Sequence, residues 1–142
     1  MQVETILQSK GRTVHTVAAD APLADAVQTL NSRKIGAVVV LDAMGKVAGI
    51  LSERDIVRRL DKDPATLLSL PVRDVMTTRV ITCTSGASVA DLMETMTQHR
   101  IRHIPIVDGG KLTGIVSIGD VVKRKIEEAE QEALALKEYI SS

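Results

Sequence analysis

The sequence has no tryptophan, no phenylalanine and only one tyrosine, Tyr139. Proteins that hold single-stranded nucleic acids stack the bases on aromatic rings, and this sequence cannot supply such a platform. It also has no excess of positive charge, because 18 lysine and arginine residues balance 18 aspartate and glutamate residues. Non-specific binding to a phosphate backbone depends on such an excess. We therefore expect no nucleic-acid partner, although the short basic run at residues 100–103 keeps that alternative open.

Cysteine and long apolar runs are also scarce. Cys83 is the only cysteine, which excludes an intramolecular disulfide and a cysteine-based metal cluster. The longest apolar run, Ala37–Leu41, is too short to cross a bilayer. Residues 1–5 lack the basic segment followed by an apolar run that is typical of a secretory signal. We expect a soluble, cytoplasmic protein with no membrane partner and no metal site.

What the sequence does contain is an internal repeat. Its 142 residues, 44% of them hydrophobic and 25% charged, have the composition of a folded protein. Residues 14–59 align with residues 80–124, which indicates a duplicated supersecondary unit. One unit of about 60 residues is marginal alone, so each copy is expected to cover the apolar face of the other. Identical pairs include Thr16 and Thr82, Asp42 and Asp108, Gly49 and Gly114, Ser52 and Ser117, and Asp55 and Asp120.

Each copy shows the same order of elements: strand, helix, strand, strand, helix. Apolar residues at helical spacing predict the first helix of each copy, and continuous apolar runs predict strands buried on both faces. We therefore predict an α/β (α+β) fold with a first repeat at 1–60, a connector at 61–72, a second repeat at 73–126 and a C-terminal helical extension at 127–142. The predicted strands are 14–17, 37–41 and 47–51 in the first copy and 80–83, 104–107 and 112–116 in the second, and helices open at Ser52 and Ser117.

The last helix is predicted to run from Ser117 towards Tyr139, well past the end of its counterpart in the first repeat. Its outer half favours helix and is acidic. Two interpretations stay open: the helix packs on its own domain, or it reaches a second subunit. An apolar stripe at helical spacing comprises Ile126, Ala129, Ala133, Leu136 and Ile140.

The most informative motif is a strand that ends at a serine, followed three residues later by an aspartate. It occurs as Ser52 to Asp55 and again as Ser117 to Asp120. This spacing is close to a helix capping box, which is a purely structural interpretation. The functional interpretation uses the same geometry: a helix N-terminus attracts a phosphate, and an ionised carboxylate accepts hydrogen bonds from both ribose hydroxyls. Both interpretations stay open on the sequence.

The duplicated unit and the paired Gly-h-h-Ser-x-x-Asp motifs resemble tandem cystathionine-β-synthase (CBS) domains, known as a Bateman module. The segments 99–108 and 110–117 add to the resemblance, which covers about residues 6 to 126. It implies two repeats packed through their sheets, with two clefts that often hold AMP, ADP, ATP or NAD. The chain is most similar to the small stand-alone members of the family.

The resemblance also implies roles for individual residues. Asp55 and Asp120 would bind ribose hydroxyls, Ser52 and Ser117 would assist at ribose or phosphate, and the backbone around Thr16 and Thr82 would meet the adenine edge. The predicted ligand-binding residues are Thr16, Ser52, Arg54, Asp55, Thr82, Arg102, His103, Pro105, Ser117 and Asp120.

The two copies differ where a phosphate would lie. Arg102 and His103 replace Gly36 and Ala37 of the first copy, and both could add charge-assisted bonds to a phosphate. Arg54 stands beside Asp55, where the second copy has an uncharged glycine. Each of these three side chains could equally be a solvated or edge residue. We expect the two clefts to be unequal, with phosphates near Arg54, Arg102 and His103.

No catalytic motif is present: the sequence has no nucleophile elbow, no phosphate-binding glycine fingerprint and no metal-ligand spacing. We therefore predict a regulatory module that is not an enzyme and binds an adenine nucleotide, AMP first, with NAD or ATP as alternatives. A constitutive protein-interaction module with unoccupied clefts is the competing hypothesis. The resemblance further implies a homodimer, a flat disc of four repeats.

Overall fold

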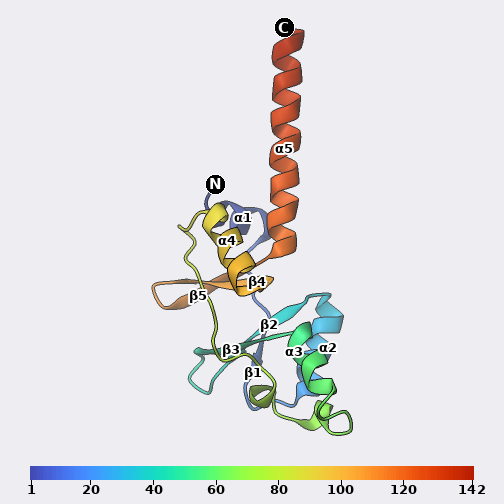
Figure 1. The fold of residues 1–142 in the computed structure, drawn as a ribbon. Coiled ribbons are helices and arrows are strands. Elements are labelled where there is room, and N and C mark those ends of the chain that lie inside the picture. Colours follow the sequence, from blue (N-terminus) through green and yellow to red (C-terminus); the bar gives the residue numbers. More distant parts are fainter. The chain divides into compact units, whose positions relative to one another are not determined.

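The computed structural model describes all 142 residues, and the chain divides into two compact units. We call Thr13–Ile81 the first-repeat unit, and Met1–Arg12 with Thr82–Ser142 the second-repeat unit. Each unit has its own apolar core. Figure 1 labels the helices and strands of both.

The first-repeat unit contains a three-stranded sheet. The strands β1 (Thr16–Ala18), β2 (Ala37–Leu41) and β3 (Val47–Ser52) lie in that order, with β1 parallel and β3 antiparallel to β2. The first four residues of β2 are buried, as its continuous apolar run predicts. Helices α2 (Leu23–Arg33) and α3 (Glu53–Leu60) complete the repeat. Two short 3₁₀ turns follow: η1 (Leu67–Ser69) lies in the connector, and η2 (Val72–Asp74) begins at its last residue. The core of this unit comprises Leu23, Ala26, Leu30, Val38, Val40, Leu51, Leu67, Val72 and Val75.

The second-repeat unit contains α4 (Val89–His99), the antiparallel hairpin β4 (His103–Asp108) and β5 (Lys111–Ser117), and α5 (Ile118–Ser141). Gly109 and Gly110 both have positive φ angles, 56° and 78°, as the predicted turn requires. The α/β fold and the long C-terminal helix are thereby confirmed. The core of this unit comprises Val3, Ile6, Leu7, Val89, Leu92, Met96, Ile104, Ile106, Val116 and Val121.

The predicted strand at 80–83 is wrong, because it shrinks to a single parallel bridge between Cys83 and Ile106. Immediately after it, the Ser85 N–H donates to the Asp108 carboxylate at 2.9 Å instead of to a strand carbonyl. The Ser85 carbonyl accepts from the backbone N–H of Glu4, 2.9 Å away. The ladder therefore does not continue past Cys83, and before it the Val80 N–H donates to the Thr78 carbonyl at 3.1 Å instead of to β4.

The helix α1 (Val3–Lys10) was not predicted, although its sequence carries the signals. Val3, Ile6 and Leu7 are buried at helical spacing, and the helix ends at Gly11, whose φ of 100° suits glycine. These residues join the core of the second-repeat unit. The helix brings Lys10 into that unit.

Helix α5 begins on the body of its own unit and then leaves it (Figure 1). Val121 is buried, whereas every residue from 129 to 142 is exposed. The interpretation in which this helix packs along its length on its own domain is therefore wrong for its outer half. No helix of the structure, α5 included, is both long and apolar enough to span a membrane.

Candidate functional site

Each unit carries a carboxylate at the junction between a strand and a helix. Ser52 ends β3, and its backbone N–H donates to Asp55 Oδ2 at 2.9 Å. Ser117 ends β5, and its backbone N–H donates to Asp120 Oδ2 at the same distance. Both junctions form a capping box, so the structural interpretation of the motif holds in both copies. The box fixes each carboxylate at a helix N-terminus, where the backbone dipoles favour negative charge.

In the second-repeat unit, Asp120 forms an ion pair with Lys10. The ammonium Nζ of Lys10 lies 2.6 Å from Asp120 Oδ2 and also donates to the Ile115 carbonyl at 2.8 Å. Burial alone would raise the pKa of the Asp120 carboxyl. The hydrogen bond and charge of Lys10, together with the Ser117 N–H, outweigh burial and hold this pKa below its usual range. Asp120 is therefore ionised at neutral pH.

In the first-repeat unit, Asp55 meets a neutral hydroxyl instead of an ammonium. Thr77 Oγ1 donates to Asp55 Oδ1 at 3.0 Å, and Ser52 Oγ donates to Asp55 Oδ2 at 3.1 Å. These are the kinds of bond that two ribose hydroxyls would make to a carboxylate. The two copies therefore differ in what a ligand would have to replace: a hydroxyl in one and a cation in the other.

Two equivalent glycines allow these neighbours to approach. An added Cβ at Gly49 would lie 2.7 Å from the Thr77 carbonyl oxygen, and one at Gly114 would lie 2.6 Å from Leu7 Cδ2. Ile50 and Thr77 form a pair of backbone hydrogen bonds beside Gly49. In both units a glycine within a strand, Gly49 in β3 and Gly114 in β5, therefore makes room for the segment that brings a partner to the aspartate.

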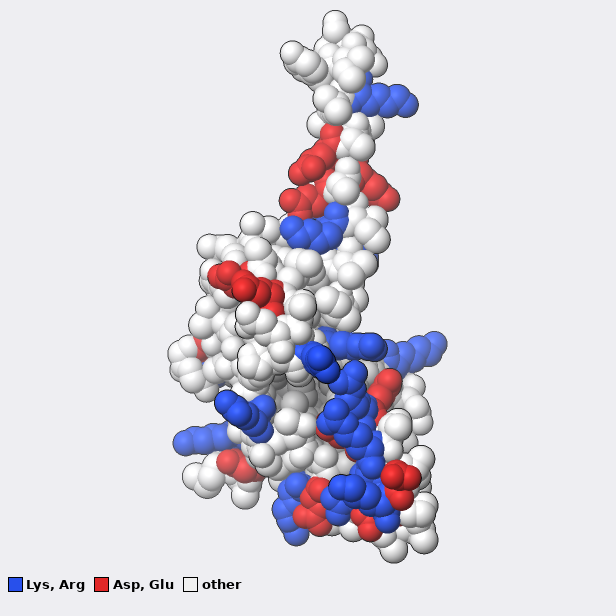
Figure 2. Space-filling view, viewed as in Figure 1, with Lys and Arg blue, Asp and Glu red and all other residues white.

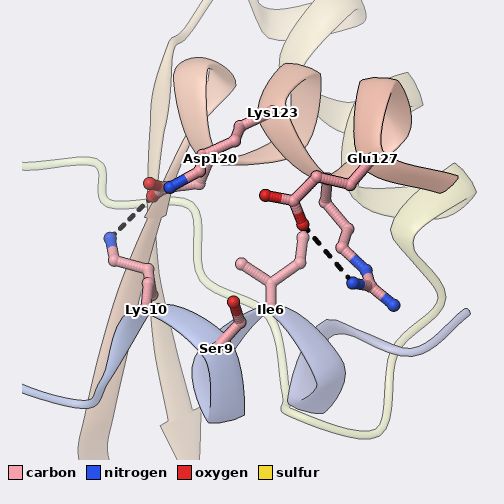
Figure 3. A pocket seen from close by; sticks show the side chains of 7 residues that line it. Ile6, Ser9, Lys10, Asp120, Lys123 and Glu127 are labelled. Atoms are coloured by element: carbon pink, nitrogen blue, oxygen red, sulfur yellow. Dashed lines mark hydrogen bonds and ion pairs between the residues drawn. The ribbon is translucent and has the colours of Figure 1, made fainter. Parts of the chain in front are cut away.

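Basic side chains follow each aspartate by one helical turn. Asp120 lines a depression of about 70 Å³ with Lys10, Lys123 and Arg124 (Figure 3). Arg124 lies 3.5 Å from the Glu127 carboxylate, and Figure 3 shows Ile6 of α1 facing these α5 side chains. The remaining lining residue is Ser9.

Asp55 lines a second depression, of about 150 Å³, with Arg58, Arg59, Lys62 and Val75. Arg59 is already engaged, because its Nε lies 2.6 Å from Asp63 Oδ2 and its Nη1 donates to the Asp74 carbonyl at 3.1 Å. Ligand pockets for small molecules are typically about 300–1,000 Å³. Neither unit by itself therefore encloses a whole nucleotide, although each presents a carboxylate beside cations.

The structure places the predicted residues of the second repeat as follows. His103 pairs with Ser117 across the β4–β5 hairpin, and the Arg102 carbonyl accepts from the Ile118 N–H at 2.8 Å. Both residues therefore adjoin the start of α5. Pro105 is buried in β4, where its carbonyl accepts from the Cys83 N–H, and Thr82 is exposed just before that bridge. Arg102, His103, Ser117 and Asp120 are brought together around one helix start.

In the first repeat, Ser52, Arg54 and Asp55 gather at the start of α3. Thr16 lies on β1, which pairs with β2 and not with β3, so its side chain belongs to the far strand of the sheet. Thr16 is exposed. The ligand roles of all the predicted residues stay predictions.

Sequence reasoning missed the residues that contact the aspartates from a distance. Lys10 is 110 positions from Asp120, and Thr77 is 22 positions from Asp55, so no local pattern links either pair. The basic residues one helical turn after each aspartate could have been predicted from the sequence. Lys123 and Arg124 follow Asp120 by three and four residues, a spacing that places side chains on one face of a helix. Arg58 and Arg59 follow Asp55 at the same spacing.

Other reactive groups are few. No group of three or more His, Cys, Asp and Glu side chains could hold a metal ion. The Cys83 thiol packs beside the core of its unit, where burial and the charge of Asp108 raise its pKa to about 11. A thiol with so high a pKa is a poor nucleophile at neutral pH.

Comparisons with known proteins identify the family. The CBS domain matches the chain twice, over residues 10–62 and 72–127. The crystal structure of the CBS-domain containing protein ATU1752 from Agrobacterium tumefaciens is similar, with a TM-score of 0.85 and 45% identity, covering 87% of this chain and 92% of that one. The mitochondrial CBS domain-containing protein CBSX3 of Arabidopsis thaliana is 34% identical over 97% of this chain and 71% of its own length.

A third likeness is more distant. The CBS domain pair of MJ0100, solved in complex with 5'-methylthioadenosine and S-adenosyl-L-methionine, has a TM-score of 0.80 and covers 90% of this chain and 98% of that one. Its identity of 23% shows the fold alone. The chain belongs to the CBS-domain family and carries two CBS domains, which confirms the resemblance drawn from its sequence.

Proposed function

We propose that this chain is a regulatory module without catalytic activity, which binds an adenosine-containing ligand at its two strand–helix junctions. The observation that carries the proposal is the equivalent placement of Asp55 and Asp120. Each carboxylate is a hydrogen-bond acceptor at the start of a helix, and basic side chains follow it one helical turn later. The carboxylate suits the two hydroxyls of a ribose, and the cations suit phosphate. Adenosine is also the part that the two ligands bound to MJ0100 share.

Among such ligands we propose an adenine nucleotide, AMP first, with ATP and NAD as alternatives. Lys10, Lys123 and Arg124 in one unit, and Arg58 and Lys62 in the other, provide positive charge that a neutral nucleoside would leave unused. Arg102 and His103, beside the start of α5, would add to it in the second repeat. A ligand regulates only when it binds one conformation better than another.

The test separates ribose binding from helix capping. Asp55→Asn and Asp120→Asn keep a side-chain oxygen for the cap but replace one acceptor by a donor. We expect each variant to fold normally and to lose AMP affinity at its own site by about 10-fold to 100-fold, since hydrogen bonds to charged groups contribute about 1.5–3 kcal/mol. Isothermal titration calorimetry with AMP measures the affinity, and circular dichroism measures the fold.

The chain supplies a matched control. Asp91 occupies the same position at the start of α4, three residues after its capping Ser88, whose Oγ accepts from the Asp91 N–H at 3.0 Å. Asp91→Asn should leave AMP binding unchanged. Unchanged AMP binding in both Asp55→Asn and Asp120→Asn would exclude the ribose role, and binding of no adenosine ligand by the wild type would favour a constitutive interaction module.

A further inference from the structure

The outer half of α5 displays apolar side chains that its own unit does not cover. The stripe continues back to Val122, and the exposed fractions of Val122, Ile126, Leu136 and Ile140 are 49%, 53%, 60% and 74%. With Ala129 and Ala133 included, these residues follow one another at alternating steps of four and three along the helix. The a and d positions of a heptad repeat have the same spacing. We define the α5 seam as Val122, Ile126, Ala129, Ala133, Leu136 and Ile140.

We propose that the α5 seam pairs with the seam of a second copy of this chain, as a parallel, in-register, two-stranded coiled coil. The seam places Ile126 and Ile140 at a positions and Leu136 at a d position. In a parallel coiled coil, β-branched residues at a with leucine at d favour two strands over three or four. Every residue from 129 onward is exposed, so this half of the helix is accessible to such a partner.

The charges that flank the seam select the second copy as the occupant. In a parallel pair each g residue faces the e residue five positions further along the partner helix. Lys125 then faces the partner's Glu130, and Glu132 faces the partner's Lys137. Both pairs are attractive, and each forms twice in a symmetric dimer. Figure 2 shows the acidic side chains along the middle of α5 between basic ones on either side.

The same charges oppose other registers. Sliding the parallel pair by one heptad brings Lys125 against Lys137 and Glu132 against Glu130. An antiparallel pair with full overlap brings Glu130 against Glu130 and Glu132 against Glu132. An antiparallel pair shifted by one heptad makes attractive pairs, but it matches only residues 122–133 or, shifted the other way, only residues 129–140. It therefore leaves either Leu136 and Ile140 or Val122 and Ile126 exposed. The parallel, in-register pair alone combines full burial of the seam with matched charge.

The dimer should be moderate in strength, because Ala129 and Ala133 bury little surface in the middle of the seam. The proposal does not depend on nucleotide binding. Lys123 and Arg124 lie between the first two residues of the seam, Val122 and Ile126, but the part of the seam from Ala129 to Ile140 contains none of the proposed ligand-binding residues. It also differs from the four-repeat disc, because it places the contact on the extended helix.

Disulfide trapping tests the direction of pairing. Ser142→Cys puts a thiol at the end of α5, where two parallel helices meet and two antiparallel helices lie about 30 Å apart at 1.5 Å per residue. We expect this full-length variant to form an interchain disulfide under mild oxidation. The wild type, with only the poorly reactive Cys83, should not. A dimer that is never trapped, or a chain that sediments as a monomer at tens of micromolar, would overturn the proposal.

Reversing the charges beside the seam tests the proposed pairing of the two helices. Sedimentation measures the dissociation constant of the dimer, and disulfide formation in the Ser142→Cys variant provides a second measure of dimerisation. Glu130→Lys should raise the dimer dissociation constant about tenfold, because two attractive pairs become repulsive. Glu138→Lys makes the same charge change at an outward-facing f position and should leave the dimer unchanged. Adding Lys125→Glu to Glu130→Lys should restore it. Equal effects of Glu130→Lys and Glu138→Lys would contradict the proposed register.

Discussion

Asp55 and Asp120 occupy the same place in the two repeats, yet their neighbours differ in charge. Thr77 gives Asp55 a hydroxyl at 3.0 Å, whereas Lys10 gives Asp120 an ammonium at 2.6 Å. A ribose that binds Asp55 replaces one hydroxyl by another. A ribose that binds Asp120 has to displace a cation, which can then turn towards a phosphate of the same ligand. Under the proposed function, the duplication therefore yields two candidate sites of different chemistry.

The role of Lys10 can be measured on Asp120 directly. In Lys10→Met we expect the pKa of Asp120 to rise, because burial continues to oppose ionisation while the hydrogen bond and charge of Lys10 are gone. A pH titration of the Asp120 side chain by NMR gives this pKa in both proteins. Lys123→Met removes another lysine of the same depression and should change it less. An unchanged Asp120 pKa in Lys10→Met would exclude the ion pair in solution.

At the scale of elements, Gly49 in β3 and Gly114 in β5 each allow a segment from elsewhere in the chain to lie against the strand. The segment that carries Thr77 bonds to Ile50 on β3, with N–H to carbonyl distances of 2.9 and 3.0 Å. In the second-repeat unit the same place is taken by α1, whose Leu7 lies over Gly114. One repeat therefore uses an extended segment and the other a helix to reach its aspartate.

Gly49→Ala should disrupt this approach. Its Cβ would lie 2.6 Å from Met76 Sδ and 2.7 Å from the Thr77 carbonyl oxygen, and the backbone atom cannot move aside cheaply. We expect the free energy of unfolding in urea to fall by about 1–3 kcal/mol, as for other overpacked sites.

Gly119→Ala is the control for that substitution. The new Cβ would meet only Ser117 Oγ at 3.6 Å, and alanine is more favourable than glycine within a helix by about 0.5–1 kcal/mol. Gly119→Ala should therefore keep or raise stability. If Gly49→Ala proved as stable as Gly119→Ala, the close packing at Thr77 would be wrong.

Elements whose signals are local could be predicted from the sequence, and those that depend on distant partners could not. The strand at 37–41 coincides with β2, and helices begin after Ser52 and Ser117 as predicted. The strand at 80–83 is reduced to a bridge at Cys83. Before the bridge the Val80 N–H donates to the Thr78 carbonyl, and after it Ser85 bonds to Asp108 and to α1, contacts that the local sequence does not indicate. The aspartates of the candidate site were visible in the motif. Lys10 was not, because only folding brings it to Asp120.

At the scale of the whole molecule, the net charge is zero, but individual carboxylates are stabilised by local hydrogen bonds and by an ion pair. The chain has equal numbers of acidic and basic residues, yet the pKa values of two carboxyls are lowered. At Asp108 the cause is hydrogen bonds from Ser85 and Thr113, and at Asp120 it is the contacts of Lys10 and Ser117, which outweigh burial. A carboxyl whose pKa is lower in the folded than in the unfolded chain stabilises the fold when it is ionised. Stability should therefore depend on pH in the acid range.

The sign of this dependence follows from Asp120. Its contribution is fully present above the pKa of an unfolded aspartate, about 3.9, and is lost as the pH falls through the lower folded value. Lys10→Met should therefore be less stable than the wild type at pH 7 by about 1 kcal/mol. The difference should begin to shrink as the pH falls below about 4, where Asp120 of the unfolded chain becomes protonated. It should disappear once the pH is below the lowered pKa of Asp120 in the folded wild type, because Asp120 is then protonated in both proteins. Chemical denaturation of both proteins at the same concentration measures it at each pH, so that any change in dimerisation through α5 affects the two alike. A difference that stays constant from pH 7 to pH 2 would mean that Lys10 stabilises the fold by packing and not through the Asp120 carboxylate.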